Sequence, residues 1–244
     1  MNLAIFDIDG TLTDTNRVDG ACYGRAMELE FGVISVGKEW KFGEVSLGRW
    51  DTYPHITDSG IIREIFQRAF RCDPEAEEIR RFIERYVGLL KESYESSPHH
   101  FSQIAGAGHI LRQVSKTSDW RVGIATGGWF ALATCKLKCA GISTEGIPLS
   151  TADDAVSRED IVKSCMAKSQ SHYRVDRFSK IVSIGDGVWD IKTARALRLP
   201  FIGVGDTKRL MQEGAVHTVQ DYRDPDGFIG LLEKAEIPRT FWRR

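Results

Sequence analysis

The chain has 244 residues, enough for one large α/β domain or for a core domain with a smaller partner. Its residues are 42% hydrophobic and 27% charged, as in an ordinary globular protein, and 33 basic against 34 acidic residues leave a net charge of -1. The absence of a basic excess argues against nucleic acid as a partner, and no apolar run approaches the roughly 20 residues of a membrane span.

The first predicted element is a strand over residues 3–9, LAIFDID, which ends in Asp7 and Asp9. Two carboxylates this close cannot both stay ionised without a counter-charge. A hard cation is the simplest remedy, and Mg²⁺ typically binds one or two carboxylates together with a substrate phosphate. We therefore predict a metal site at the end of this strand. The alternative interpretation is a glycine turn whose carboxylates are merely solvated.

The next stretch is predicted to be a small helical unit inserted after the first strand. Apolar residues recur at helical spacing over 59–71 and again from 74 to about 94, and we expect a further helix over 19–31. No buried strand is evident in this region. We therefore divide the chain into an insert of residues 15–97 and a core made of residues 1–14 and 98–244.

Three further apolar runs are predicted strands, over residues 121–128, 180–187 and 200–205. Strands that alternate with helices favour a parallel sheet with helices on both faces, a Rossmann-like α/β fold. The polar candidates lie at the C-terminal ends of these runs. In open α/β sheets that edge is where ligands bind.

Two of these strand ends carry groups suited to a phosphate and its metal. Asp186 and Asp190 are four residues apart after the strand over 180–187, so they share a helix face and add acidic oxygens for a metal ion. Thr126 and Gly127 follow the strand over 121–128, where a hydroxyl and backbone N–H groups can face an anion. Acidic residues also favour helix N-termini without any site, which is the alternative for the aspartate pair.

A cation for the phosphate is expected on the helix that follows Ser157, whose spacing to Asp160 resembles a capping box. Arg158 then lies in the first helical turn, near the sheet edge. Lys163 lies about 7.5 Å further along the axis and is rotated by roughly 140°, so only one of the two can readily point into the same pocket. This geometry favours Arg158, and Lys163 stays open as the alternative.

Taken together in chain order, these motifs resemble those of the haloacid dehalogenase superfamily of phosphotransferases. Asp7-Ile8-Asp9-Gly10-Thr11 matches the first motif, Thr126 the second, Arg158 or Lys163 the third, and the pair Asp186 and Asp190 the fourth. The insert lies where one subgroup, the phosphoglycolate phosphatase-like enzymes among them, carries a helical cap domain. The usual third-motif lysine followed by proline is absent.

The resemblance implies a Mg²⁺-dependent phosphatase that hydrolyses a small phosphomonoester. Asp7 would attack phosphorus to form an aspartyl-phosphate, and Asp9 would act as acid and then as base. Asp7, the main-chain carbonyl of Asp9 and Asp186, with Asp190 beside them, would hold the metal ion. Thr126, Gly127 and the third-motif cation would bind the transferring phosphoryl oxygens.

The same resemblance leaves other functions open. A sugar-phosphate mutase shares both aspartates of the first motif. A phosphonate hydrolase would need a cap lysine, for which Lys38, Lys41 and Lys91 are available. A non-catalytic module that binds a phosphorylated ligand is a further alternative. Substrate choice is expected to depend on the insert, where Arg49 and His55 are candidate contacts; the alternative for each is a surface residue. Phosphoglycolate is the substrate that the resemblance suggests, and the oligomeric state is unreadable.

The location is predicted to be cytoplasmic and reducing. The first residues run straight into strand-like sequence without a basic region or a cleavage site, and the five cysteines are scattered and odd in number.

Overall fold

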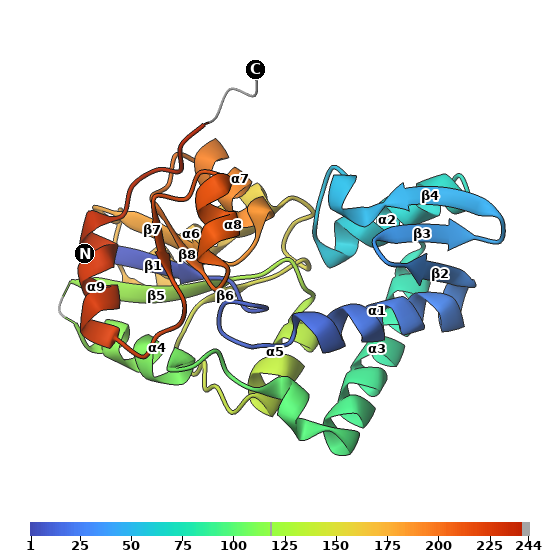
Figure 1. The fold of residues 1–244 in the computed structure, drawn as a ribbon, viewed down its shortest axis with the longest axis horizontal. Helices are drawn as coiled ribbons and strands as arrows, with labels where there is room; N and C mark the ends of the chain where they lie inside the picture. Colours follow the sequence, from blue (N-terminus) through green and yellow to red (C-terminus); the bar gives the residue numbers. More distant parts are fainter. Residues whose placement is uncertain (118, 241–244) are drawn as a thin grey trace.

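The computed structural model describes residues 1–117 and 119–240, and it has two parts (Figure 1). One part is built on a six-stranded sheet in which all neighbouring strands pair in parallel. The strand order is β6 (Leu149–Ser150), β5 (Trp120–Ala125), β1 (Asn2–Phe6), β7 (Ile181–Gly185), β8 (Phe201–Val204) and β9 (His217–Val219). The predicted Rossmann-like α/β fold is confirmed.

Alternating side chains of the buried strands build two hydrophobic layers, one on each face of the sheet. Ala4 and Phe6 of β1 pack with α4 (Ala107–Lys116), α5 (Phe130–Cys139) and α9 (Pro225–Lys234). Leu3 and Ile5 pack on the opposite face with α6 (Arg158–Tyr173), α7 (Val188–Ala196) and α8 (Thr207–Gln212). Because successive strand residues point to opposite faces, a nearly continuous apolar run is what a doubly covered strand requires.

Four predicted strands match β1, β5, β7 and β8, each shorter than its apolar run. The runs extend beyond the strands because Asp7, Thr126 and Asp186 already lie in the turns that follow. The short edge strands β6 and β9 were not predicted. Each has only two or three residues, too few to show a periodic pattern.

The second part is the insert. It contains α1 (Asn16–Phe31), α2 (Asp58–Ala69) and α3 (Ala76–Ser96), close to the three predicted helices. Two short 3₁₀ helices cover Trp50–Thr52, within the insert, and Pro98–Phe101, directly after it. Its buried side chains form one cluster, which also includes Trp129 and Leu132 at the start of α5. The insert therefore shares hydrophobic contacts with one helix of the core.

The expectation of a purely helical insert was wrong. Residues 33–49 form a three-stranded antiparallel sheet, β2 (Val33–Val36), β3 (Glu39–Phe42) and β4 (Val45–Arg49). Two-residue turns with Gly37 and Gly43 at positive φ join these strands. Glycine at the first turn position is a hairpin signal that the sequence does contain. The strands were not predicted because most of their residues are exposed, which leaves no buried apolar run.

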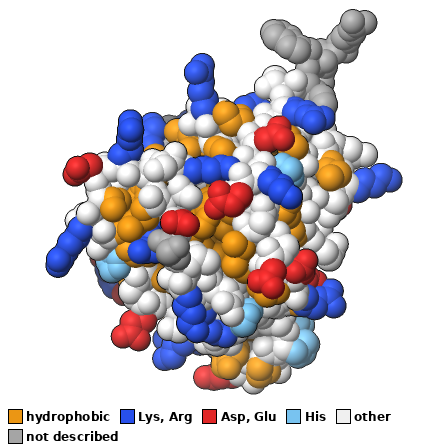
Figure 2. Space-filling view, turned by 90° about the vertical axis from the view of Figure 1, so that its left-hand side faces the viewer, with side chains coloured by type: hydrophobic (Ala, Val, Ile, Leu, Met, Phe, Trp, Pro, Cys, Tyr) orange, Lys and Arg blue, Asp and Glu red, His pale blue; other side chains and the backbone are white. Residues whose placement is uncertain are grey.

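The outer surface shows no concentration of one charge on the face that Figure 2 presents. Among its described side chains, basic and acidic groups are interspersed over the end of the core that carries α9. Within residues 1–117 and 119–240, no helix is both long enough and apolar enough to cross a membrane.

Candidate active site

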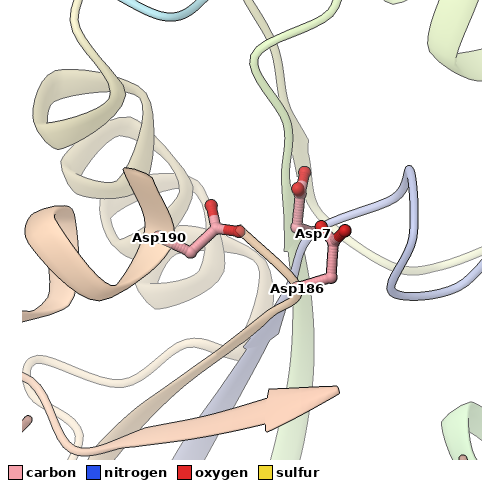
Figure 3. A group of neighbouring side chains, drawn as sticks. All are labelled: Asp7, Asp186 and Asp190. Carbon is pink, nitrogen blue, oxygen red and sulfur yellow. The ribbon is translucent and has the colours of Figure 1, made fainter. Parts of the chain in front are cut away.

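Three predicted aspartates meet at the C-terminal edge of the central strands (Figure 3). Asp7 follows β1, Asp186 follows the neighbouring strand β7, and Asp190 lies in the first turn of α7. One carboxylate oxygen from each lies within 4.8 Å of the others. Parallel pairing of β1 with β7 therefore brings together residues that are about 180 positions apart in the sequence.

These carboxyl groups hold protons more tightly than exposed ones do. Burial raises the pKa of Asp7 to about 7, with Asp190 and Asp9 adding to the shift and Arg158 opposing it. Burial and the charge of Asp7 raise the pKa of Asp186 to about 7. Burial also raises the pKa of Asp190, to about 6, although Arg158 pulls it down. The cluster is thus acidic, buried and short of positive charge.

Arg158 supplies the cation nearest to these aspartates. The Ser157 side chain accepts a hydrogen bond from the backbone N–H of Asp160, so α6 begins at Arg158 as predicted. One guanidinium nitrogen of Arg158 lies 2.7 Å from Asp190 Oδ1 and 3.6 Å from Asp7 Oδ2. Lys163 is not brought into the cluster, because its side chain is 59% exposed and its Nζ lies 2.9 Å from Asp160 Oδ1.

Thr126 and Gly127 lie beside the aspartates because β5 pairs with β1 on the other side. The Thr126 side chain is almost fully buried, and its Oγ accepts a hydrogen bond of 3.3 Å from the N–H of Gly128. A Cβ atom at Gly127 would lie 2.8 Å from a guanidinium nitrogen of Arg158 and 3.1 Å from the carbonyl oxygen of Ile56. Glycine is needed here for close approach rather than for a special backbone conformation.

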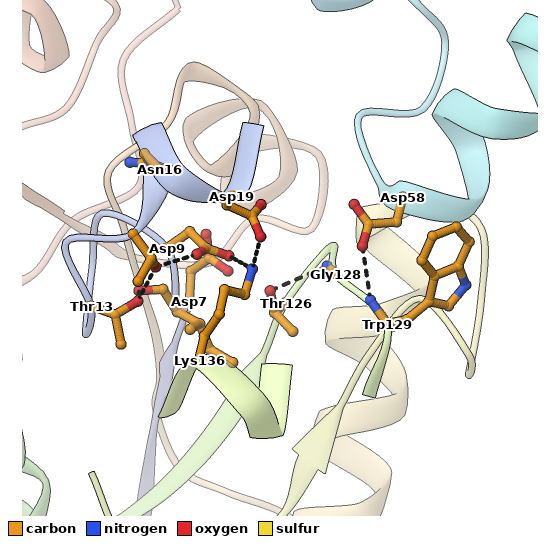
Figure 4. A network of polar contacts seen from close by, with 12 residues as sticks. Asp7, Asp9, Thr13, Asn16, Asp19, Asp58, Thr126, Gly128, Trp129 and Lys136 are labelled. Atoms are coloured by element: carbon orange, nitrogen blue, oxygen red, sulfur yellow. Dashed lines mark hydrogen bonds and ion pairs between the residues drawn. The ribbon is translucent and has the colours of Figure 1, made fainter. Parts of the chain in front are cut away.

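Asp9 is the one first-motif carboxylate that turns toward the insert (Figure 4). Its Oδ1 accepts a hydrogen bond of 2.5 Å from the Thr15 hydroxyl, and its Oδ2 lies 2.5 Å from Lys136 Nζ. Sequence reasoning missed Lys136. No motif distinguishes Lys136 from Lys138 on the same helix, and the signal for it is that its neighbours Ala133 and Leu137 face the core.

A cavity of about 360 Å³ lies over these residues, between the core and the insert. Asp7, Asp9, Thr126, Gly127 and Arg158 line its core side. The insert contributes polar and aromatic groups, namely Asn16, Asp19, Tyr23, Ser35, Lys38, Trp40, Trp50, Thr57 and Asp58. Arg49 is not brought to this cavity: its side chain is 60% exposed, and one of its nitrogens lies 2.8 Å from Asp51 Oδ2. His55 lines a separate depression.

The aspartates have oxygens free for a metal ion. Asp7 Oδ1 and Asp186 Oδ1 are buried and have no hydrogen-bond partner among the described residues. Burying polar oxygens without partners is costly, and hard divalent cations prefer carboxylate oxygen ligands. Both oxygens of Asp190, in contrast, already accept hydrogen bonds, from Arg158 and from the N–H of Gly187. Asp7 and Asp186 therefore fit a Mg²⁺ ion.

A parallel α/β sheet with acidic groups, a hydroxyl and a buried cation at its C-terminal edge is the arrangement of a ligand-binding α/β protein. The family is more specific than this class. The model of the haloacid dehalogenase-like hydrolases matches residues 4–204, and the chain belongs to this family. No sequence among the curated proteins matches it.

Solved structures of the same fold are distant in sequence. A hydrolase from Pseudomonas syringae is 22% identical with a TM-score of 0.62, and the match covers 96% of this chain and 99% of that one. A β-phosphoglucomutase from Clostridium difficile is 17% identical, with a TM-score of 0.67 and coverage of 95% and 97%. CbbY from Rhodobacter sphaeroides, in complex with xylulose-(1,5)bisphosphate, is 18% identical, with a TM-score of 0.64 and coverage of 91% and 95%.

Proposed function

We propose that this protein is a Mg²⁺-dependent phosphatase that hydrolyses a small phosphomonoester through an aspartyl-phosphate on Asp7. One observation carries the proposal. The buried, unpartnered oxygens of Asp7 and Asp186 belong to one cluster of carboxylates, and Asp7, which lines the cavity, lies 3.6 Å from the Arg158 guanidinium. Carboxylate oxygens without partners, next to a buried arginine, fit a metal ion and a phosphate together.

Asp7 and Asp186 would hold the Mg²⁺ ion, with the main-chain carbonyl of Asp9 as the further ligand that the family resemblance implies. When bound, the ion supplies positive charge that offsets the repulsion between a carboxylate nucleophile and a phosphate. Asp190 has a different part in the proposal. Because it binds Arg158 at 2.7 Å and caps α7 through Gly187, it fixes the guanidinium toward the phosphate.

The reaction would proceed in two displacements. In the first, an oxygen of Asp7 attacks phosphorus and the bond to the ester oxygen breaks. The ester oxygen keeps the electron pair and takes a proton from Asp9, and the organic group leaves as the free alcohol. In the second, water attacks phosphorus, gives its proton to Asp9, and the bond to Asp7 breaks. Thr126 Oγ, the N–H groups of the turn and Arg158 would hold the phosphoryl oxygens throughout.

The cavity supports a small organic group on the substrate. Its volume of about 360 Å³ is near the lower end of ligand pockets, and Tyr23, Trp40 and Trp50 give the insert side an aromatic wall. Phosphoglycolate, a sugar phosphate and other small esters all fall within this size. The proposed setting is the cytoplasm, where the five free cysteines would stay reduced.

The test is an assay of purified protein on a panel of small phosphomonoesters, with Mg²⁺ and with excess chelator. We expect phosphate release that requires Mg²⁺ and is poorly supported by Ca²⁺, which prefers longer bonds and more ligands. The Asp7→Asn variant should lose at least about three orders of magnitude in rate, as losing a covalent nucleophile does. Asp14→Asn, in the same loop but exposed, is the matched control.

Two results would replace this proposal. Transfer of phosphate between positions of a sugar phosphate, without net release, would identify a mutase. Turnover of a phosphonate with borohydride trapping at Lys38 would identify a phosphonate hydrolase. Lys38 lines the cavity, but its Nζ lies 2.9 Å from Asp51 Oδ2, which holds it at the rim and favours the phosphatase. Full activity in chelator would remove the metal from the mechanism.

A further inference from the structure

Lys136 is a buried charge that the proposed reaction does not use. Its side chain is 1% exposed, although it lies in the middle of α5 between residues that pack in the core. Its Nζ lies 2.5 Å from Asp9 Oδ2 and 2.7 Å from Asp19 Oδ1, and Figure 4 shows it reaching from α5 between the two carboxylates. The ammonium thus joins the catalytic loop to the first turn of α1 in the insert.

The fold alone does not explain this lysine. Taking an ammonium out of water costs several kcal/mol even when it is paired, so a buried ion pair is weak evidence of stabilisation. Burial lowers the pKa of Lys136, but the charges of Asp19, Asp9 and Asp58 raise it by more, so the pKa lies above its usual range. An apolar residue of similar length would fill the same space between Ala133 and Leu137 without that cost.

The contacts of Asp9 give the lysine a role. The Asp9 carboxylate is held at both oxygens, by the Thr15 hydroxyl at 2.5 Å and by Lys136 at 2.5 Å. Thr15 is itself hydrogen bonded to Thr13 at 2.6 Å. Lys136 is in turn fixed by Asp19, which accepts a further hydrogen bond of 2.6 Å from the Tyr86 hydroxyl. Two sets of partners therefore set the position and rotation of one carboxylate.

We propose that Lys136 is a positioning residue that holds Asp9 where it can exchange a proton with the leaving oxygen and with water. This inference rests on the proposed phosphatase function. In the first displacement the phosphorus–oxygen bond breaks, its electron pair stays on the ester oxygen, and Asp9 supplies the proton. In the second the water that forms the new phosphorus–oxygen bond returns a proton to Asp9. Because Lys136 also pairs with Asp19, the position of Asp9 depends on the position of α1 against the core.

The dependence of the rate on the leaving group shows whether the general acid Asp9 is correctly placed. Phenyl phosphate releases a weakly acidic phenol that needs a proton, whereas 2,4-dinitrophenyl phosphate releases an anion stable without one. In the Lys136→Met variant, the burst rate on phenyl phosphate should fall about 100-fold, the usual worth of a general acid. The burst rate on 2,4-dinitrophenyl phosphate should change less than about 3-fold. A merely structural lysine would lower both equally, and equal losses would overturn the proposal.

The controls lie on the same helix. Lys138→Met removes an exposed lysine two residues away and should leave both burst rates near those of the wild type. Lys136→Gln keeps a hydrogen-bond donor and should give an intermediate loss on phenyl phosphate, and it provides the same comparison if the methionine variant does not fold.

A crystal structure of the folded variant provides a readout independent of turnover. The Asp9 carboxylate should leave its wild-type position, and an unmoved carboxylate would refute the positioning role. If the wild type hydrolyses neither ester with Mg²⁺, the proposed function fails, while the position of Asp9 still decides whether Lys136 holds it.

Discussion

The position of Arg158 on α6 distinguishes it from Lys163, the other candidate for the third-motif cation. The first turn of α6 faces the sheet edge, so the guanidinium reaches Asp190 and Asp7, and its Nε donates 2.9 Å to the carbonyl oxygen of Ile56 in the insert. Lys163 lies on the exposed side of the same helix. Both candidates are basic, so the turn of α6 on which each lies, rather than its residue type, decides which one reaches the aspartates.

Arg158→Ala should lower kcat/KM by about 100-fold or more, because removing one donor to a developing oxyanion typically costs that much. Lys163→Ala should stay within about 2-fold of the wild type, since an exposed ion pair contributes little. Steady-state kinetics on one phosphomonoester measures both variants. The reverse ranking would show that Lys163 is the third-motif cation and that α6 turns differently in the working enzyme.

The buried aspartates make stability depend on pH and metal. The pKa values of Asp7 and Asp186 are about 7 in the folded chain, above the ordinary 3.8, so the folded state binds more protons between these values. This stabilising difference is present below the ordinary value and is lost as the pH rises through about 7. Without metal, the free energy of unfolding should therefore fall between about pH 5 and about pH 8, and Mg²⁺ should restore it mainly at the upper end.

Urea unfolding at the two pH values, with and without Mg²⁺, measures this effect. Asp186→Asn cannot ionise at that position, so its unfolding free energy should change less with pH and respond less to Mg²⁺. A wild-type chain that becomes more stable with rising pH in the absence of metal would contradict the assignment of raised pKa values to this cluster.

At the scale of helices and strands, the core was predictable and the contacts of the insert were not. The central core strands β1, β5, β7 and β8 are buried on both faces, so their apolar runs are visible in the sequence, and the first three of them end at motifs. The insert strands β2–β4 expose most of their residues and offer only glycine turns as a signal. Lys136 was not predicted for another reason. Its partner Asp9 is 127 residues away in the sequence, so no local spacing relates the two.

The start of α2 is where an element of the insert meets the core. The Thr57 side chain accepts a hydrogen bond of 3.0 Å from the N–H of Gly60, which caps the helix, and donates 2.7 Å to the carbonyl oxygen of Val156. Next to it, the N–H of Asp58 donates 2.8 Å to the carbonyl oxygen of Gly127. One threonine thus both begins a helix and attaches it beside the site.

Thr57→Ala should lower the free energy of unfolding by about 1–2 kcal/mol, because it removes an N-cap and leaves Val156 without its donor. It should also raise KM, since the attachment of α2 beside the cavity weakens. Thr57→Ser keeps the hydroxyl and should restore both values to near wild type. Denaturant unfolding and steady-state kinetics on the same preparations check this pair, and a serine variant as impaired as the alanine variant would show that the methyl group matters instead.

At the scale of the whole molecule, the insert lies beside the C-terminal edge of the sheet and lines one side of the cavity there. Residues 56–58 bind the core through the hydrogen bonds of Thr57 to Val156 and of Asp58 to Gly127, and through the Arg158 contact to Ile56. The packing of Phe82 in α3 against Trp129, with ring centroids 5.8 Å apart, joins the insert to the start of α5. We propose that the insert acts as a cap that opens by releasing the segment around α2, while the contact with α5 stays closed, and that closure excludes bulk water from the aspartyl-phosphate.

This arrangement predicts a division of labour between core and cap. Changes at Asp7 or Asp186 should abolish turnover of every substrate, whereas Trp50→Ala should change which phosphomonoester is preferred, because Trp50 forms part of the cavity wall away from the aspartates. Arg49→Ala is the matched control next to it in sequence: its side chain is exposed and paired with Asp51, so substrate preference should stay unchanged. The measurement is kcat/KM for each variant on several esters that include phenyl phosphate. We expect the ratios between substrates to shift by about 10-fold or more for Trp50→Ala, as the loss of aromatic contact with some organic groups and not others implies. An equal fractional loss on every ester would show that the cap closes the site without selecting what enters it.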